Sequence, residues 1–355
     1  MTRGWLGERT RGIAALGGYK KPPAGRGPLK MDSNENYAIP ASFQEAARAA
    51  AATPDEREYP LGGAERLVEA LSAYTGMPAA MIGVGCGSDQ ILDMILSSFA
   101  PAGARVLTSD PTFSFFEERC KLRSITMDKV PFGPGMELDA SEMASRSGGA
   151  DMLYLDSPNN PTGFQFPRGE LEGLVRSFEG LVIIDEAYGE FGRYTLSGLA
   201  AEVDNLVVVR TLSKSFGLAG LRLGYFVAPE EFTDAFMRVV QYPYPLASHS
   251  IEAGIAALAD RGAVGEAVSL VRSERARITE ALSSLGQFEV FKSDANFVLF
   301  DAGGAYGRVH SALAEQGIAV RRVGRVGERG GCLRVGVGSP EMNSRFLSAV
   351  HDLMR

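Results

Sequence analysis

Residues 181–187 have the sequence LVIIDEA, and residues 206–213 have the sequence LVVVRTLS. Both begin with an unbroken apolar run, which is typical of a strand that is buried on both faces of a parallel sheet. Similar short runs occur at residues 81–84, 104–110 and 151–156, and stretches with helical character separate them. This alternation predicts an α/β protein with a mainly parallel central sheet that is covered by helices.

The spacing of apolar residues also predicts helices and a second domain. Leu67 and Leu71 lie one helical turn apart, and Gly76 is placed to end that helix. The pattern changes after residue 245, where a long helical zone precedes several strand candidates. The sequence therefore predicts a large α/β domain over residues 31–245 and a smaller α+β domain over residues 246–355.

The first 30 residues have a different character. Residues 1–30 contain the pairs Gly17-Gly18 and Pro22-Pro23 but no sustained apolar period. Glycine and proline pairs of this kind are typical of turns and loops. We therefore expect an extended N-terminal arm, and we assign it to the small domain.

Composition and charge exclude several functional classes. The chain has 355 residues with 45% apolar side chains, enough for a large core, and its net charge of −7 argues against nucleic-acid binding. Its three cysteines and three histidines are scattered, so we expect neither a disulfide framework nor a metal site. No apolar run approaches the roughly 18 residues of a membrane span, and we identify no signal peptide. A cytoplasmic protein is expected.

A glycine-rich stretch, GVGCGSD at residues 83–89, follows one of the apolar runs and opens the next helix. Backbone N–H groups and the positive end of the helix dipole at Gly87, Ser88 and Asp89 can hold a phosphate. A dinucleotide-binding fingerprint needs glycine at the place of Ser88, so that interpretation is not supported. An ordinary strand-to-helix turn explains the stretch equally well.

Two further motifs follow strand candidates. The loop DSPNNPTG at residues 156–163 is stiffened by two prolines, and it leaves the Asn160 amide available to a ligand. In the stretch VIIDEAY, Asp185 ends an apolar strand, where a carboxylate is costly unless a cation or a donor meets it. Each motif also has a structural explanation, a rigid turn for the first and a helix N-cap for the second.

The stretch RTLSKSFGLAGLRLGY, at residues 210–225, places one lysine directly after a buried strand. Lys214 lies among small and hydroxylated residues, where its ammonium can be desolvated and deprotonated, the condition for Schiff-base nucleophilicity. A solvated surface lysine is the alternative. Four such features nevertheless follow one another at the ends of strand candidates. They are the helix start that can hold a phosphate, the loop with Asn160, the carboxylate of Asp185 and Lys214. Their order favours a shared ligand site.

This set of motifs resembles the fold-type I enzymes that use pyridoxal 5'-phosphate, and among them the histidinol-phosphate aminotransferase branch. The resemblance runs from about residue 15 to the C-terminus, and the matching stretches are SNEN, YPLGGAERLVEAL, GCGSDQILDMIL, DPTFSFF, DSPNNPTG, VIIDEAY, RTLSKSFGLAGLRLGY, PYPL, SDANFVLF and GCLRVGVGSPEMN. It implies a large domain with a mainly parallel seven-stranded sheet, a smaller α+β domain, and a homodimer with a shared active site.

For the cofactor, the resemblance implies specific roles. Lys214 would form a Schiff base with the cofactor aldehyde, and Asp185 would pair with the pyridine nitrogen. Asn160 and Tyr188 would bind the 3'-oxygen of the ring. Phe113, at a position where the family usually has tyrosine, would stack on the ring. The residues that would hold the phosphate are Gly87, Ser88, Asp89, Thr211, Ser213 and Arg222.

The resemblance also implies contacts to the substrate and to a second subunit. Arg334 would bind the substrate's carboxylate or phosphate together with Arg321, because an arginine fork binds both kinds of anion. For Arg321 a surface position is the alternative. Tyr19, Asn34 and Asn160 would complete the substrate site. Tyr59 would reach the cofactor phosphate of the neighbouring subunit.

The implied reaction is a ping-pong transamination in which L-histidinol phosphate gives up its amino group and 2-oxoglutarate collects it, as in histidine biosynthesis. Lys214, Asp185 and Tyr188 would be the catalytic residues, with Lys214 moving the proton at the substrate's Cα. The alternatives are an aminotransferase for an aromatic or specialised amino acid, a lyase similar to threonine-phosphate decarboxylase, and a non-enzymatic ligand sensor. The partners expected are an amino donor and a 2-oxo acid.

Overall fold

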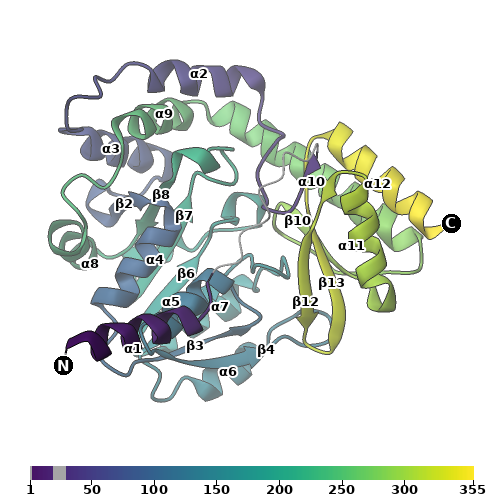
Figure 1. Cartoon of the computed structure of the whole chain (residues 1–355). Helices are drawn as coiled ribbons and strands as arrows, with labels where there is room; N and C mark the ends of the chain where they lie inside the picture. Colours follow the sequence, from purple (N-terminus) through teal and green to yellow (C-terminus); the bar gives the residue numbers. More distant parts are fainter. Residues whose placement is uncertain (1, 19–28) are drawn as a thin grey trace.

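The computed structural model of the chain describes residues 2–18 and 29–355, and a seven-stranded sheet forms its centre (Figure 1). The strands are β2 (Ile82–Cys86), β3 (Arg105–Asp110), β4 (Thr126–Pro131), β5 (Met152–Asp156), β6 (Leu181–Asp185), β7 (Leu206–Thr211) and β8 (Leu223–Val227). Their order is β2-β8-β7-β6-β5-β3-β4, in which β8 is antiparallel to both neighbours and the other pairs are parallel. The predicted mainly parallel central sheet is therefore confirmed.

Helices cover both faces of this sheet, and they are α3 (Gly63–Thr75), α4 (Gly87–Ser98), α5 (Ser114–Leu122), α6 (Ala140–Arg146), α7 (Arg168–Ser177), α8 (Glu230–Ala235) and α9 (Ser248–Ala259). The helix α2 (Ala41–Ala51) packs on α9. On one face, Ile95 of α4 and Phe116 of α5 share a buried cluster with Ile183 of β6. Ile184, the next residue of β6, belongs to the cluster on the opposite face, together with Val175 of α7. Because both faces are covered, every residue of the central strands can be apolar.

A four-stranded antiparallel sheet lies beside the large one, to the right in Figure 1, with the order β12-β13-β10-β9. Its strands are β9 (Glu289–Val290), β10 (Phe297–Asp301), β12 (Arg321–Val326) and β13 (Arg329–Gly336). The helices beside it are α10 (Arg261–Ser284), α11 (Tyr306–Glu315) and α12 (Pro340–Met354). The short strand β1 (Leu29–Lys30) pairs in parallel with β11 (Ile318–Ala319), so the N-terminal part of the chain joins the segment that leads into β12.

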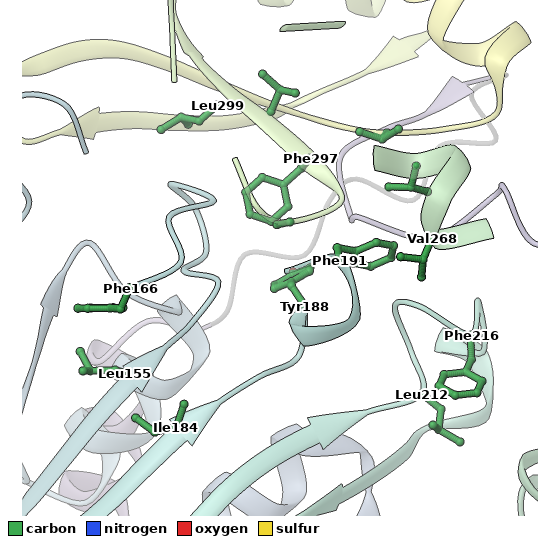
Figure 2. Close-up of a cluster of buried hydrophobic side chains, with 14 of the residues drawn as sticks. Leu155, Phe166, Ile184, Tyr188, Phe191, Leu212, Phe216, Val268, Phe297 and Leu299 are labelled. Carbon is green, nitrogen blue, oxygen red and sulfur yellow. The ribbon is translucent and has the colours of Figure 1, made fainter. Parts of the chain in front are cut away.

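The apolar core continues from the large sheet to the smaller one (Figure 2). Leu155 of β5 and Ile184 of β6 belong to the same buried cluster as Phe297 and Leu299 of β10. Tyr188, just after β6, meets the Phe297 ring edge-on with 5.2 Å between the ring centroids. This shared packing holds the smaller sheet near the carboxyl ends of the large sheet's strands.

The N-terminal segment differs from the extended arm that we expected, because Thr2–Ala15 form the helix α1. Residues 6–18 are exposed apart from the half-buried Gly7, so this part of the chain offers no buried apolar stripe. The sequence criterion detects a helix through such a stripe and therefore missed this one. Neither α1 nor any other helix in the described ranges is long and apolar enough to cross a membrane.

Candidate active site

A pocket of about 750 Å³ lies at the carboxyl ends of β5, β6 and β7, the edge at which open α/β sheets bind ligands. Asp156, Asp185 and Thr211, the last residues of those strands, line it. The smaller sheet also contributes to the lining of the pocket, with Arg321 of β12 and Arg334 of β13. The pocket thus forms where the two sheets meet.

The structure brings most of the predicted site residues together in this pocket. Those that line it are Asn34, Ser88, Asp89, Phe113, Asn160, Asp185, Tyr188, Thr211, Ser213, Lys214, Arg222, Arg321 and Arg334. Gly87 lies directly behind the lining, where an added Cβ would come within 2.5 Å of the Nη2 atom of Arg222. Tyr59 does not line the pocket, and Tyr19 lies outside the described residues.

Two glycines bring β8 against the first turn of α4. A Cβ on Gly224 of β8 would lie 2.3 Å from the carbonyl carbon of Gly87, which excludes any larger residue. Gly87 itself has a φ of +77°, a left-handed conformation that glycine adopts without steric cost. No side-chain cap covers the start of α4, so its first backbone N–H groups are open to an anion.

The guanidinium of Arg222 lies beside this helix start. Its Nη2 donates to the Asp89 Oδ2 at 2.9 Å, and its Nη1 donates to the Ser213 Oγ at 3.5 Å. The Thr211 hydroxyl donates to the same Ser213 oxygen at 2.9 Å. A guanidinium, two hydroxyls and an uncapped helix N-terminus are a donor set that suits a phosphate group.

Asp185 ends β6 as a buried carboxylate with 3% of its surface exposed. Its Oδ1 accepts from the Ala187 N–H at 2.9 Å, and its Oδ2 accepts from the Tyr154 hydroxyl at 3.1 Å. Burial, and next the charge of Asp156, raises the pKa of Asp185 to about 7. A cationic group placed against this carboxylate lowers that pKa, since it stabilises the charged form. The carboxylate therefore suits a ligand with a protonated nitrogen.

Lys214 follows β7 and is half-buried. Its Nζ donates to the backbone oxygen of Ser33 at 3.2 Å and lies 5.6 Å from the centre of the Tyr188 ring. The lysine tip is therefore located between the segment that follows β1 and the segment that follows β6. Its amine lies in the pocket that Asp185 also lines, as nucleophilic chemistry on a bound aldehyde requires.

Tyr188 and Asn160 are each oriented by a neighbour. The Tyr188 hydroxyl accepts from the Asn34 Nδ2 at 3.0 Å. Burial, opposed by the nearby Arg334 charge, raises the pKa of Tyr188 to about 12, so its hydroxyl stays protonated and can donate. The Asn160 Oδ1 accepts a hydrogen bond from the Arg334 Nη1, which fixes the orientation of the amide.

Arg321 and Arg334 lie directly opposite each other in the antiparallel pair β12 and β13. Side chains at such positions point to the same face of a sheet, and both of these line the pocket. Arg334 is 7% exposed, donates to the Asp32 backbone oxygen at 2.9 Å and lies 5.1 Å from the Phe297 ring centre. Like charges at opposed positions repel, so this pair favours an anion between the two guanidiniums.

Several residues that build the site were not predicted from the sequence, namely Thr112, Tyr154, Asp156, Arg322 and Arg325. Asp156 ends an apolar strand just as Asp185 does, so the reasoning used for Asp185 could have found it. Tyr154 and Thr112 carry no comparable signal. Their contacts with the two carboxylates depend on how β5 lies beside β6 and β3.

Tyr59 lies on the surface, away from the pocket of its own chain. It is 72% exposed, and its ring stacks on Tyr244 with 4.6 Å between the centroids. Leu61 and Tyr242, close by in sequence, are exposed as well. Exposed aromatic and aliphatic side chains of this kind mark interaction surfaces when they lie together.

The large, mainly parallel sheet, the smaller antiparallel sheet and the similarity to a solved aminotransferase place this chain in the fold-type I class of transferases. Comparison with protein families agrees and is more specific, because the model of aminotransferase class I and II matches residues 26–350, which is most of the chain. The chain belongs to this family. The resemblance inferred from the sequence motifs is thereby confirmed.

Individual relatives support the same family assignment. A histidinol-phosphate aminotransferase of Desulfitobacterium hafniense (strain Y51) is 36% identical over 304 residues, which cover 84% of this chain and 84% of that protein. The solved structure of a histidinol-phosphate aminotransferase from Sinorhizobium meliloti, in complex with pyridoxal-5'-phosphate, matches with a TM-score of 0.85 and 26% identity, and the match covers 93% of this chain and 91% of that one.

A lyase shares the fold as well. The solved L-threonine-O-3-phosphate decarboxylase from Porphyromonas gingivalis matches with a TM-score of 0.79 and 21% identity, and the match covers 92% of this chain and 99% of that one. At this identity the likeness concerns the fold alone. The reaction therefore has to be argued from the site.

Proposed function

We propose that this protein transfers the amino group of L-histidinol phosphate to 2-oxoglutarate, with pyridoxal 5'-phosphate as its cofactor. The observation that carries the proposal is the opposed pair Arg321 and Arg334, in a pocket that also contains Lys214 and Asp185. An anion-binding pair beside an amine and a buried carboxylate suits an amino donor with an anionic group. Relatives of 31–36% identity that carry the name histidinol-phosphate aminotransferase support the same substrate.

The cofactor fits the donor set of the pocket. When bound, pyridoxal 5'-phosphate supplies an aldehyde carbon that takes up the amino group and a ring that accepts the electron pair left by the departing Cα proton. Arg222, Ser213, Thr211 and the uncapped start of α4 suit its phosphate. Asp185 suits the ring nitrogen. The remaining ring contacts that we propose come from Phe113, Asn160 and Tyr188.

The protein's own residues then perform three tasks. Lys214 acts as the general base that takes the Cα proton and as the general acid that returns it. Asp185, shielded from water, keeps a negative charge beside the ring nitrogen and so keeps a proton there. Arg321 and Arg334 bind the anionic group of the substrate, which restricts the orientations of the reacting carbon.

One anion site can serve both substrates in turn. A guanidinium fork binds a carboxylate and a phosphate with similar geometry. The donor's oxo product, imidazole acetol phosphate, leaves before the 2-oxo acid enters, and the amino group stays with the enzyme between the two half-reactions. This order is the ping-pong scheme, and it involves small molecules only.

The test of the proposed function is an assay with L-histidinol phosphate and 2-oxoglutarate. We expect L-glutamate to form in an amount equal to the donor consumed, with no release of carbon dioxide. A parallel screen with aromatic amino acids measures kcat/KM for the nearest alternative donors. Carbon dioxide released from L-threonine phosphate, or a higher kcat/KM for an aromatic donor, contradicts the proposed substrate.

Arg334→Ala is expected to weaken recognition of the donor's anionic group. Loss of one partner from a buried charged contact costs about 2–5 kcal/mol, which corresponds to a rise in KM of roughly 30-fold to several thousand-fold. Steady-state kinetics with varied L-histidinol phosphate measures this rise. Arg308→Ala, on the exposed side of α11, is the matched control and should leave KM unchanged. An unaltered KM in Arg334→Ala contradicts its role.

We further propose a homodimer in which Tyr59 reaches the cofactor phosphate of the partner's pocket, supported by the exposed stack of Tyr59 on Tyr244. Mixing Lys214→Ala chains with Tyr59→Ala chains then produces hybrid dimers with one intact site. We expect the refolded mixture to be more active than either variant alone, and sedimentation to give a dimer. A monomer, or a mixture no more active than Tyr59→Ala, contradicts this arrangement.

We also propose the domain division at residues 31–245 and 246–355, with residues 1–30 joined to the small domain. The two separate sheets and the pairing of β1 with β11 support it. The proposed boundary precedes α9, whose contacts with α2 and α3 connect the start of the small domain to the large one. A cytoplasmic location is proposed as well, supported by three free cysteines.

A further inference from the structure

A second buried carboxylate, that of Asp156, lies beside Asp185 and has no part in the reaction described above. β5 and β6 are parallel, and Asp156 is the register partner of Asp185. Both residues end their strands, both are 3% exposed, and both line the pocket. Burial of a carboxylate costs free energy unless donors satisfy it, so the partners of Asp156 reveal what it holds in place.

The carboxylate of Asp156 accepts three hydrogen bonds, and they come from two loops. Its Oδ1 accepts from the Thr112 hydroxyl at 3.0 Å and from the Asn159 amide at 2.8 Å. Its Oδ2 accepts from the Asn160 backbone N–H at 2.7 Å. Thr112 precedes Phe113 in the loop after β3, whereas Asn160 belongs to the loop after β5. Asp156 therefore joins the loops that carry two of the proposed ring contacts.

Asn159 adds a second connection between the same loops. Its Nδ2 also donates to the backbone oxygen of Pro111 at 3.1 Å. Its Oδ1 accepts from the backbone N–H of Thr162 at 3.1 Å and from the hydroxyl of that residue at 2.7 Å. Because these groups form one buried network, a shift of one loop would break hydrogen bonds in the other.

The charge of Asp156 acts on its surroundings, because its three donors are neutral groups. Burial raises the pKa of Asp156 to about 6, and its three hydrogen-bond donors oppose this rise because they stabilise the ionised carboxylate. Asp185, Tyr154 and Tyr188 are the ionisable groups that face it, and its charge raises the pKa of each. Asp89 of α4 adds to this effect at Asp185. Negative charge here favours a positive charge on a ring bound against Asp185.

We propose that Asp156 is a positioning residue, which holds Phe113 and Asn160 at fixed places around the cofactor ring and, through its negative charge, favours the protonated form of the bound cofactor. The inference rests on the proposed use of pyridoxal 5'-phosphate. Asp156 makes no contact with the reacting atoms in this role, because it acts through Asp185 and through the two loops.

The decisive variant is Asp156→Asn, compared with the wild type by equilibrium binding of pyridoxal 5'-phosphate and by pH titration of the bound cofactor's absorbance. Asparagine keeps the size of the side chain but loses the charge and one acceptor oxygen. We expect the Kd of the cofactor to rise about tenfold and the midpoint of the titration to fall by about one pH unit. An unchanged midpoint, or a Kd within twofold of wild type, overturns the proposal.

Thr112→Val and Thr112→Ser separate the connection between the loops from the charge. Valine keeps the shape of threonine without its hydroxyl, so we expect the Kd to rise roughly three- to tenfold while the midpoint stays at the wild-type value. Serine keeps the hydroxyl and should restore the Kd. If Asp156→Asn fails to fold, equal Kd values for these two variants overturn the proposal. A wild-type protein that binds no pyridoxal 5'-phosphate contradicts the proposed function instead.

Discussion

Lys214→Ala is expected to abolish transamination, with kcat reduced by at least about 10⁴-fold. The Nζ of Lys214 is the amine that we place in the pocket with Asp185, where it is held near Ser33 and the Tyr188 ring. Its removal takes away both the nucleophile for the cofactor aldehyde and the group that moves the Cα proton. Glutamate formation from L-histidinol phosphate and 2-oxoglutarate measures the loss.

The matched control is Lys292→Ala, which removes an exposed lysine outside the pocket. It should retain the wild-type kcat, so that loss of a lysine in general is separated from loss of this one. If Lys214→Ala keeps more than about one hundredth of the wild-type kcat, a group other than Lys214 moves the Cα proton. Absorbance of the cofactor in the variant shows whether the pocket still binds it.

The largest expected effect on stability comes from Arg210→Met. Arg210 lies in the interior, where its Nη2 is 2.8 Å from the Glu190 Oε1 and its Nη1 is 3.5 Å from the Glu186 Oε2. The Thr195 hydroxyl accepts from the same guanidinium at 3.1 Å. Loss of the cation leaves the buried Glu186 carboxylate and the half-buried Glu190 carboxylate without their counter-charge, which lowers the free energy of unfolding by about 3–5 kcal/mol.

Urea unfolding of Arg210→Met and of a surface variant checks this value. Arg238→Met removes a cation from an exposed i, i+4 pair with Asp234, so its free energy of unfolding should stay within about 0.5 kcal/mol of wild type. Similar unfolding free energies for the two variants would mean that the Glu186 and Glu190 carboxylates are neutralised in another way. Glu186 directly follows Asp185, so this ion cluster also supports the end of β6.

Most strands of the large sheet could be predicted from their apolar runs, whereas β4 and β8 could not. β6 and β7 each begin with four consecutive apolar residues, and the sequence identifies them at once. β4 lies at the sheet edge with several half-exposed polar residues, and it was not identified as a strand. β8 is buried along its whole length, but it begins inside the stretch at residues 210–225, which was interpreted for its lysine and glycines instead. An apolar pattern indicates burial, so it gives little signal for β4, whose residues are mostly exposed or half-exposed.

Some residues of the candidate site could likewise be predicted from the sequence, and others could not. Lys214, Asp185 and Asn160 follow recognisable strands or loops, so their motifs reveal them without any geometry. Arg322 and Arg325 line the pocket because β12 has irregular register with β13, between Arg322 and Gly324 and again near Val326. A bulge re-aims side chains, and its position depends on the partner strand. Such contacts depend on how two strands pair, and no local sequence pattern reveals that pairing.

The hydrogen bond from Arg334 to Asn160 bears on how the enzyme distinguishes its substrate from other amines. Arg334 stands on the smaller sheet and Asn160 on a loop of the larger one. An incoming anion competes with the asparagine oxygen for the same guanidinium, so its arrival is expected to free the side-chain amide for the ring, while the Asn160 backbone stays bonded to Asp156. An amine that lacks the anion leaves this bond intact. Discrimination then operates on the rate of turnover as well as on affinity.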